Sequence, residues 1–118
     1  KLQGDREFIV WGTGRPRREF LYVDDLADAC VFLMEQQISS GIYNVGTGED
    51  LTIRELATMI KDAIKFTCKL SFDTSKPDGT PMKLLDNSKL SALGWKARTD
   101  LRDGIAKVYA SYLHSLKG

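Results

Sequence analysis

Residues 10–29 read VWGTGRPRREFLYVDDLADA, and this stretch decides the fold of the first part of the chain. The segment Glu7 to Trp11 is rich in β-forming residues and predicts a strand, which ends at a turn over Gly12 to Arg18. We expect a second short strand over Glu19 to Val23, and then a helix that runs to about Gln37. The turn carries three arginines between two regular elements. This arrangement suits a phosphate-bearing ligand, because guanidinium groups pair bidentately with phosphate oxygens.

Strands and helices continue to alternate along the rest of the chain, which predicts an α/β fold. Thr52 and Glu55 form a capping box, and apolar residues follow them at helical spacing. Beyond the first helix the expected elements are a strand over Ile42 to Gly46, the helix after Thr52, a strand over Lys69 to Asp73, a loop over Ser75 to Lys83, a short helix from about Asp86 to Leu93, and a last helix after Thr99 or Asp100.

The first helix is apolar around most of its circumference, so we expect it to be buried on more than one side. In a chain of 118 residues this pattern indicates a neighbour outside the sequence. Asp24 and Asp25 are adjacent, and adjacent residues on a helix do not face each other. We therefore expect one of them to cap the helix rather than to act in acid–base chemistry.

Length and charge limit the classes of function. The 118 residues suffice for one compact domain, and we expect 1–118 to be a single domain. The chain opens at Lys1 rather than at a methionine, so we expect a segment of a longer protein. Its 17 basic and 16 acidic residues leave a net charge of +1, without the positive excess of a dedicated nucleic-acid binder. No apolar run approaches the length of a membrane span.

The cysteines and the histidine indicate no metal site. Cys30 lies within an apolar run and Cys68 lies just before an expected strand, without metal-ligand spacing or a secretory signal. We expect reduced thiols in a cytoplasmic protein. His114 is the only histidine and falls in the last helix, so no zinc site is expected.

Motifs of cofactor binding and of catalysis are missing from the sequence. Gly-x-Gly pairs occur at positions 12/14 and 46/48, but both lack the third glycine of a dinucleotide fingerprint, and we interpret them as tight turns. No Tyr-x-x-x-Lys pair and no Ser-His-Asp or Cys-His arrangement is visible. The sequence therefore predicts no catalytic, cofactor-binding or metal-ligating residue, and its chemistry is that of a binding surface.

The candidate binding surface combines the arginine turn with the loop over 75–83. Arg18 adjoins a strand, and Trp11 lies at the other end of the same turn. Together they suit a ligand that joins a flat ring or a sugar to a phosphate. Asp78 could accept from a sugar hydroxyl, and Lys76 or Lys83 could meet a phosphate. Core packing of Trp11, and an ordinary solvated surface for the arginines and the loop, are the alternatives.

Three stretches carry a family resemblance: VWGTGRPRREFLYVDDLADA, IYNVGTGEDLTIRELA and FDTSKPDGTPMKLLDNSKLSALGW. They resemble the C-terminal part of the GDP-L-fucose synthase family, within the extended short-chain dehydrogenase/reductase superfamily. The segments R-E-F-x-x-V-D-D and N-V-G-T-G are shared widely among nucleotide-sugar epimerases and dehydratases. The combination of V-W-G-T-G with K-P-D-G-T-P is more specific to the fucose synthases.

The resemblance implies a small C-terminal substrate-binding domain for a GDP-sugar, with the Rossmann half absent. Enzymes of this family convert GDP-4-keto-6-deoxy-D-mannose to GDP-L-fucose with NADPH, as 3,5-epimerases and 4-reductases. Their cofactor site and catalytic residues lie in the N-terminal Rossmann domain, and neither cysteine of this chain matches the family's catalytic cysteine. We therefore expect this chain to be inactive alone, and the full-length enzyme to be a homodimer without nucleic-acid or membrane partners.

Carried over by position, the resemblance implies several substrate-binding residues. Trp11 and Arg18 match positions that contact the GDP-sugar, with Arg18 on the diphosphate. Asp78 falls in the matching P-D-G turn, and Lys69 matches a basic position that reaches the nucleotide.

Other cations near these positions are assigned less directly. Lys76 and Lys83 flank the implied site, whereas Met82 stands where relatives often have a basic residue. Arg15 and Arg17 lie where the family varies, and we expect both to be solvated.

Three other interpretations stay open. One is the equivalent domain of another NAD(P)-dependent nucleotide-sugar epimerase or dehydratase, which a preference for UDP over GDP would reveal. The second is a non-enzymatic module that binds nucleic acid or a protein through the arginine turn, and the balanced net charge argues against it. The third is a purely structural interaction domain, which replacement of Trp11 and Arg18 without effect on ligand binding would favour.

Overall fold

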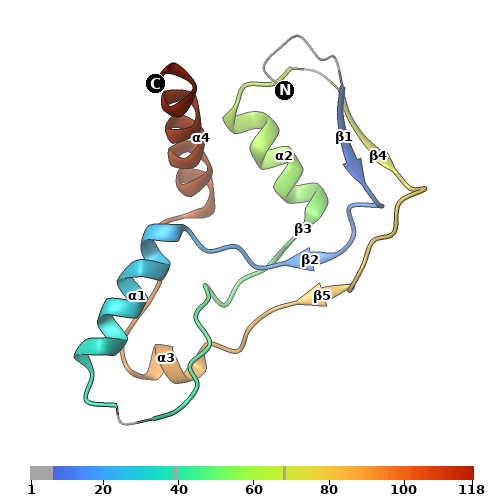
Figure 1. Ribbon diagram of the computed structural model, residues 1–118. Coiled ribbons are helices and arrows are strands. Elements are labelled where there is room, and N and C mark those ends of the chain that lie inside the picture. Colours follow the sequence, from blue (N-terminus) through green and yellow to red (C-terminus); the bar gives the residue numbers. More distant parts are fainter. Residues whose placement is uncertain (1–6, 39, 68) are drawn as a thin grey trace.

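The computed structural model describes residues 7–38, 40–67 and 69–118, and Figure 1 shows how its elements are arranged. In chain order the elements are β1 (Glu7–Trp11), β2 (Arg17–Arg18), α1 (Val23–Glu35), β3 (Leu51–Thr52), α2 (Ile53–Ala63), β4 (Lys69–Asp73), β5 (Met82–Lys83), α3 (Ser88–Ala92) and α4 (Leu101–Lys117). This mixture of helices and short strands confirms the predicted α/β class. Cys30 is a free, exposed thiol, whereas the expectation for Cys68 lies outside the described residues.

The strands form two small sheets. β1 and β4 lie side by side in parallel, from Glu7 opposite Lys69 to Trp11 opposite Asp73, which confirms both predicted strands (Figure 1). The second sheet has the order β3-β2-β5, in which β2 runs antiparallel to β3 and parallel to β5. Because β2 is central, the residues of the arginine turn are held from two sides.

Helix α2 begins where the sequence predicts. The Glu55 N–H donates to Thr52 Oγ1 at 3.1 Å, and the Thr52 N–H donates to the Glu55 carboxylate at 2.8 Å. This reciprocal pair satisfies donors that the start of a helix otherwise leaves unpaired. Helices α3 and α4 also confirm predicted helices, and α3 ends just ahead of Gly94, whose φ is +101°. None of the described helices combines the length and the apolar character needed to cross a bilayer.

A small core lies where α1 meets α3 and the segment after α3. Ala29 and Leu90 are fully buried and Trp95 is nearly so. The Trp95 indole N–H donates to the Asp28 carboxylate at 2.9 Å, which satisfies the only polar atom of the ring. This core fixes the end of the molecule opposite to β1 and β4 (Figure 1).

Asp25 does not cap α1, and the prediction of a capping aspartate is wrong. The N-cap residue is Tyr22, without a side-chain capping bond, and Asp24 and Asp25 lie within the first turn. The buried Asp25 carboxylate instead accepts from the Thr99 N–H at 2.9 Å and from the Thr99 hydroxyl at 3.2 Å. Because Thr99 precedes α4, Asp25 ties the start of α1 to the start of α4.

Helix α1 is less enclosed than its composition predicts. Among its residues only Asp25 and Ala29 are buried, while the side chains of Met34 and Val23 are 83% and 62% exposed. The helix ends at Glu35 rather than at about Gln37. Within the described chain no element covers the apolar outer side, and its burial by a neighbour outside the sequence stays a prediction.

Two predicted strands do not form within the described residues. The segments 19–22 and 42–46 have no strand partner, and α1 already begins at Val23. Side chains take the place of a neighbouring strand along 42–46: Lys89 Nζ donates to the Ile42 carbonyl at 3.0 Å, and Asn87 Nδ2 donates to the Gly46 carbonyl at 3.1 Å. The expected loop over 75–83 in turn ends in the short strand β5.

Candidate functional site

The turn between β1 and β2 begins with a glycine in a left-handed conformation. Gly12 has a φ of +90°, and its N–H donates to the Asp73 carbonyl at 2.9 Å, which extends the contact between β1 and β4. A Cβ at Gly12 would collide with Asp78 Oδ1. Glycine therefore allows both the backbone geometry and the close approach of the loop that follows β4.

Asp78 is fixed to this turn through both of its carboxylate oxygens. Oδ1 accepts from the Thr13 N–H at 2.7 Å, and Oδ2 accepts from the Thr13 hydroxyl at 2.8 Å. These two hydrogen bonds, backbone first, lower the pKa of Asp78 below its usual 3.8, and the charge of Arg15 adds to the effect. Asp78 is thus a carboxylate at neutral pH. Each oxygen retains acceptor capacity for a donor on a ligand.

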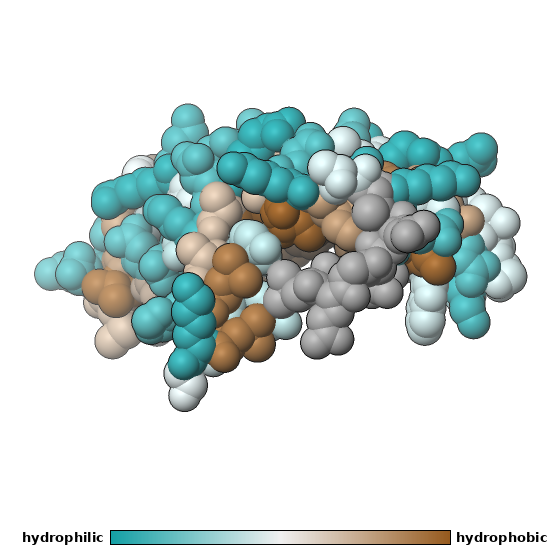
Figure 2. Space-filling view, turned by 90° about the horizontal axis from the view of Figure 1, so that it is seen from above, coloured by the Kyte–Doolittle hydropathy of each residue, from teal (hydrophilic) through white to brown (hydrophobic). Residues whose placement is uncertain are grey.

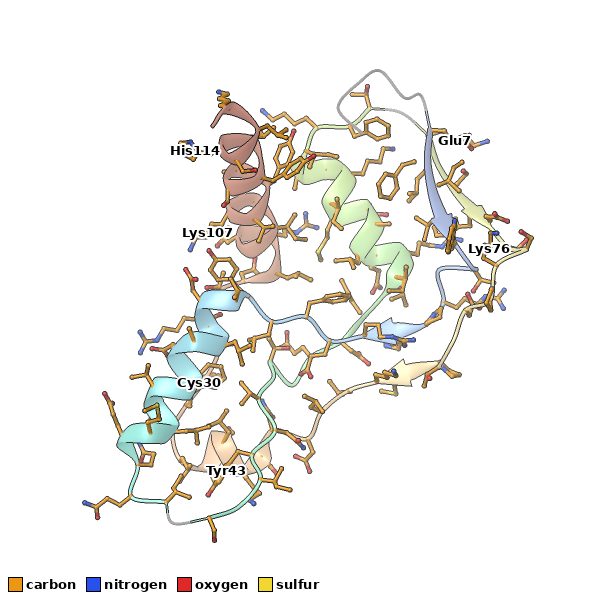
Figure 3. The ribbon with its side chains drawn as sticks, viewed as in Figure 1. Glu7, Cys30, Tyr43, Lys76, Lys107 and His114 are labelled. Carbon is orange, nitrogen blue, oxygen red and sulfur yellow. The ribbon has the colours of Figure 1, made fainter. Side chains whose placement is uncertain are left out.

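Trp11 presents an open aromatic surface at the end of β1. Its side chain is 69% exposed, so the alternative of core packing is wrong. The ammonium nitrogen of Lys76 lies 5.1 Å from the centroid of the indole, within the range of a cation–π contact. Figure 3 labels Lys76 at the tip where β1 and β4 end. An exposed ring and a cation therefore occur together at this edge.

Arg18 and Lys83 lie opposite each other in adjacent strands. They are Cα partners in the parallel pairing of β2 with β5. Arg18 Nη1 donates to the Arg17 carbonyl at 2.7 Å, and within the described residues neither Arg18 nor Lys83 forms an ion pair with a carboxylate. A Cβ at Gly79 would lie 3.8 Å from Arg18 Nη2, so the guanidinium lies against the turn that carries Asp78.

Lys69 is not brought to this site. It opens β4 opposite Glu7, whereas Asp73 at the other end of the same strand lies opposite Trp11. Four residues of extended strand separate Lys69 from Asp73, a distance of about 13 Å at 3.3 Å per residue. Figure 3 shows Glu7 and Lys76 at opposite ends of this strand pair. Of the six implied residues, Lys69 is the one that the fold places apart.

Arg17 is not left unpaired in solvent: its side chain is 41% exposed, and its guanidinium forms an ion pair. Its Nη2 lies 3.0 Å from Asp50 Oδ1, and its Nε donates to the same oxygen at 3.1 Å. This hydrogen bond and the opposite charge of Asp50 raise the pKa of Arg17 above its usual value. Arg17 therefore anchors β2 to the segment before β3, which leaves Arg18 as the cation of this strand without an acidic partner among the described residues.

Arg54 also contacts the turn after β1. The sequence pattern does not predict this role of Arg54. Its guanidinium carbon lies 3.9 Å from the centroid of the Phe72 ring, and its Nη2 donates to the Thr13 carbonyl at 3.4 Å. The Arg54 N–H also donates to the Gly14 carbonyl at 3.0 Å. These contacts from the start of α2 hold the turn between β1 and Arg18.

A large apolar hollow lies elsewhere in the described part of the chain. It has a volume of about 890 Å³ and lies between the facing sides of α2 and α4 and the segment 20–23. Among its lining residues are Leu56, Met59, Ile60, Ile105 and Val108. We refer to it as the α2–α4 groove. Figure 2, which looks down on this end of the molecule, shows hydrophobic residues exposed between polar ones.

Neither the groove nor the turn provides a metal site within the described residues. No group of three or more histidine, cysteine, aspartate or glutamate side chains converges there or elsewhere in that part of the chain. The arrangement of Trp11, Lys76, Asp78, Arg18 and Lys83 is suited to binding an anion that carries a flat ring and hydroxyl groups.

Several known sequences are similar to this chain. Residues 1–46 match the NAD dependent epimerase/dehydratase family. The chain is 52% identical over 116 residues to GDP-L-fucose synthase 1 of Arabidopsis thaliana, an alignment that covers 98% of this chain and 36% of the relative. It is 45% identical to the GDP-L-fucose synthase of Escherichia coli (strain K12), over 96% of this chain and 38% of the relative. The chain thus spans about a third of the length of the curated relatives it matches.

A solved structure shows the same fold. The crystal structure of a GDP-L-fucose synthetase from Naegleria fowleri bound to NADP superposes with a TM-score of 0.88 at 32% sequence identity. The match covers 94% of this chain and 36% of that chain. The fold is therefore that of a small α/β segment of the extended short-chain dehydrogenase/reductases.

Proposed function

We propose, from the premise that this chain corresponds to the C-terminal part of the GDP-L-fucose synthases, that it binds the GDP-sugar of a longer NADPH-dependent epimerase/reductase. The observation that carries the proposal is the pairing of Arg18 with Lys83 in neighbouring strands, without a carboxylate partner among the described residues. Two like charges held side by side are destabilising unless an anion joins them. A diphosphate supplies that anion.

The other side chains of the site match the remaining parts of such a ligand. Arg18 and Lys83 would hold the diphosphate, and each charged hydrogen bond contributes roughly 1.5–3 kcal/mol. The exposed ring of Trp11 offers a stacking surface for a base or a sugar, with Lys76 beside it. Asp78 offers acceptor oxygens for hydroxyl or amino groups.

The role of this chain in the reaction would be anchoring. Binding energy realised on the nucleotide, remote from the reacting sugar carbons, can be used to orient the sugar for chemistry. The residues described here provide the anchor, and we place the proton transfers and the reduction in the remaining part of the enzyme. The chain alone is expected to show no turnover.

The residues present do not fit NADPH, whose role in such an enzyme is to supply hydride. The Gly-x-Gly turn at 46–48 follows an extended segment and precedes a helix, as a pyrophosphate loop does. The Gly48 N–H, however, already donates to the Glu19 carboxylate at 2.7 Å. A turn whose N–H faces a fixed carboxylate repels a pyrophosphate. We therefore propose that the cofactor site lies in the N-terminal part of the longer enzyme.

The apolar surfaces support the proposal of a single domain within a longer enzyme. The α2–α4 groove and the outer side of α1, where Met34 is 83% exposed, leave apolar area that a stand-alone domain rarely shows. We propose that the rest of the enzyme packs there, and that the whole enzyme is a homodimer in the cytoplasm. The free thiol of Cys30 is in keeping with a reducing compartment.

Titration of the isotope-labelled chain with GDP, UDP and NADP⁺ tests the proposal. We expect GDP to shift the backbone amide signals of Trp11, Arg18 and Lys83, UDP to do so more weakly, and NADP⁺ to leave them in place. A stronger response to UDP would contradict the GDP assignment and favour another nucleotide-sugar enzyme. If the chain is folded and none of the three nucleotides shifts its amide signals, the binding role of this chain is contradicted.

A further inference from the structure

The strands that carry Arg18 and Lys83 are short. β2 and β5 contain two residues each. In addition to the ladder pairing of β2 with β5, the Arg17 N–H donates to the Pro81 carbonyl at 2.8 Å at one end of the pair. The cations at the other end repel each other. A contact that joins the two strands at this end would oppose that repulsion.

Glu19 supplies contacts at that end. It directly follows Arg18, and its Oε1 accepts from the Leu85 N–H at 3.3 Å, two residues beyond Lys83. Its Oε2 accepts from the Gly48 N–H at 2.7 Å and from the Thr47 hydroxyl at 3.4 Å. One carboxylate thus joins the end of β2 to the segment after β5 and to the turn that leads to β3.

The fit around this carboxylate is close. A Cβ at Gly46 would lie 2.6 Å from Glu19 Oε1, so the loop reaches the carboxylate only because position 46 is glycine. Hydrogen bonds from backbone N–H groups to a charged acceptor are stronger than those between neutral groups. The contact is therefore a strong support for a sheet with so few residues.

Glu19 does this without neutralising the cation beside it. Within the described residues it forms no ion pair with Arg18, although the two are adjacent in sequence. Its charge is directed to neutral N–H and hydroxyl donors instead. The guanidinium of Arg18 stays available for an anion.

We propose that Glu19 is the positioning residue that holds Arg18 and Lys83 side by side for a diphosphate. The inference rests on the proposed function, since the anchored anion is the one assigned there. It goes beyond that function by naming a residue that touches no ligand and yet sets the affinity for the nucleotide. It also explains why the turn at 46–48 binds a protein carboxylate rather than a phosphate.

The test compares Glu19→Gln with Glu49→Gln in the 118-residue chain. Both remove one negative charge near the same turn, but within the described residues the Glu49 carboxylate makes no hydrogen bond. For Glu19→Gln we expect a Kd for GDP, measured by calorimetry, that is raised about tenfold, since a glutamine cannot accept from all three donors. The Gly48 and Leu85 amides should exchange faster with solvent. Glu49→Gln should keep both properties near those of the wild type.

If Glu19 only stabilised the fold, other destabilising variants would weaken GDP binding equally. Asp25→Ala removes a buried contact near α4 and leaves every contact of Glu19 intact. If lost stability alone weakened GDP binding, Asp25→Ala would raise the Kd as Glu19→Gln does, and the proposal would be overturned. Unchanged GDP affinity in Glu19→Gln would also overturn it.

The design separates this proposal from the proposed function. If the wild-type chain ignores GDP, the proposed function fails, and the positioning role is then read from the amide signals of Arg18 and Lys83. Those signals should shift in Glu19→Gln and stay in place in Glu49→Gln. Signals that stay in place in both variants would show that Glu19 does not position the pair.

Discussion

Thr13 donates its backbone N–H to one carboxylate oxygen of Asp78 and its hydroxyl to the other. This double contact joins the turn after β1 to the loop after β4 at the point where Trp11 and Lys76 meet. The geometry of the candidate site is thereby linked to the ionisation of one exposed carboxyl group.

The contact between Thr13 and Asp78 should depend on pH only in strongly acidic solution. Hydrogen bonds from Thr13 lower the folded-state pKa of Asp78 below 3.8. The stabilisation is therefore fully present above the unfolded-state pKa and is lost as the pH falls through the lower folded-state value. We expect the Thr13 amide signal to be constant from neutral pH down to about pH 4 and to move below it.

Asp78→Asn is the control for this titration. An amide oxygen still accepts one hydrogen bond but does not ionise. The Thr13 amide signal of the variant should stay flat in the same pH range. A Thr13 signal that titrates well above pH 4, or that titrates equally in Asp78→Asn, would contradict the assignment.

Arg18→Ala should weaken GDP binding by about ten- to a hundredfold. The reason is the loss of a charged hydrogen bond to the diphosphate, worth roughly 1.5–3 kcal/mol. Arg102→Ala, which removes an exposed arginine from the start of α4, is the matched control. Calorimetry with GDP measures both. Equal GDP affinities of the two variants would contradict the assignment of Arg18 to the anion site.

Lys69→Ala should leave GDP affinity within about twofold of the wild type in this chain. Lys69 lies at the Glu7 end of the strand pair, about 13 Å from Asp73 by the rise of a β-strand. Family resemblance implies a contact with the nucleotide, whereas the fold places Lys69 away from Arg18. A large loss of affinity in Lys69→Ala would show that the ligand extends along the whole length of β4.

Asp25→Ala should lower the free energy of unfolding by about 1–3 kcal/mol. The Thr99 N–H and hydroxyl would lose a buried charged acceptor. Asp24→Ala removes the neighbouring, exposed carboxylate of the same helical turn and should cost less than about 1 kcal/mol. Urea denaturation of both variants gives the comparison. Equal losses would contradict the role of Asp25 in joining α1 to α4.

Gly104→Ala should stabilise the chain by about 0.5–1 kcal/mol. Gly104 lies within α4, where glycine is unfavourable, and a Cβ would meet Tyr22 and Thr99 only at 3.5–3.6 Å, an ordinary contact distance. Gly46→Ala should destabilise the chain, because the added Cβ would collide with the Glu19 carboxylate. Thermal unfolding of the two variants should therefore shift in opposite directions.

Local patterns predicted the elements whose cause lies within a few residues. The capping box of Thr52 and Glu55 and the apolar periodicity after it are complete within one segment, and α2 forms as they indicate. The strands 7–11 and 69–73 were likewise predicted from composition. Their pairing in one parallel sheet was not, because register depends on residues far apart in the chain.

Errors arose where a partner from elsewhere decides the structure. Arg17 resembles a solvated turn residue until Asp50 is brought beside it. The segment 42–46 has the composition of a strand, but its carbonyls bind the side chains of Lys89 and Asn87 within the described residues. Asp25 occupies a capping position in sequence, yet Thr99 offers its carboxylate two donors. Spacing along the chain carries no signal for any of these contacts.

The parallel pairing of β1 with β4 also bears on the order of events in folding. Trp11 reaches Asp73, and thereby the loop with Lys76 and Asp78, only after the chain between them has closed into a long loop. Closing such a loop costs entropy that local helices do not incur, so non-local pairing forms slowly. Helices α2 and α4 can appear before this step, but the site cannot. The fluorescence of Trp11 near Lys76 would therefore report a late stage of folding, and nucleotide binding would select the assembled chain.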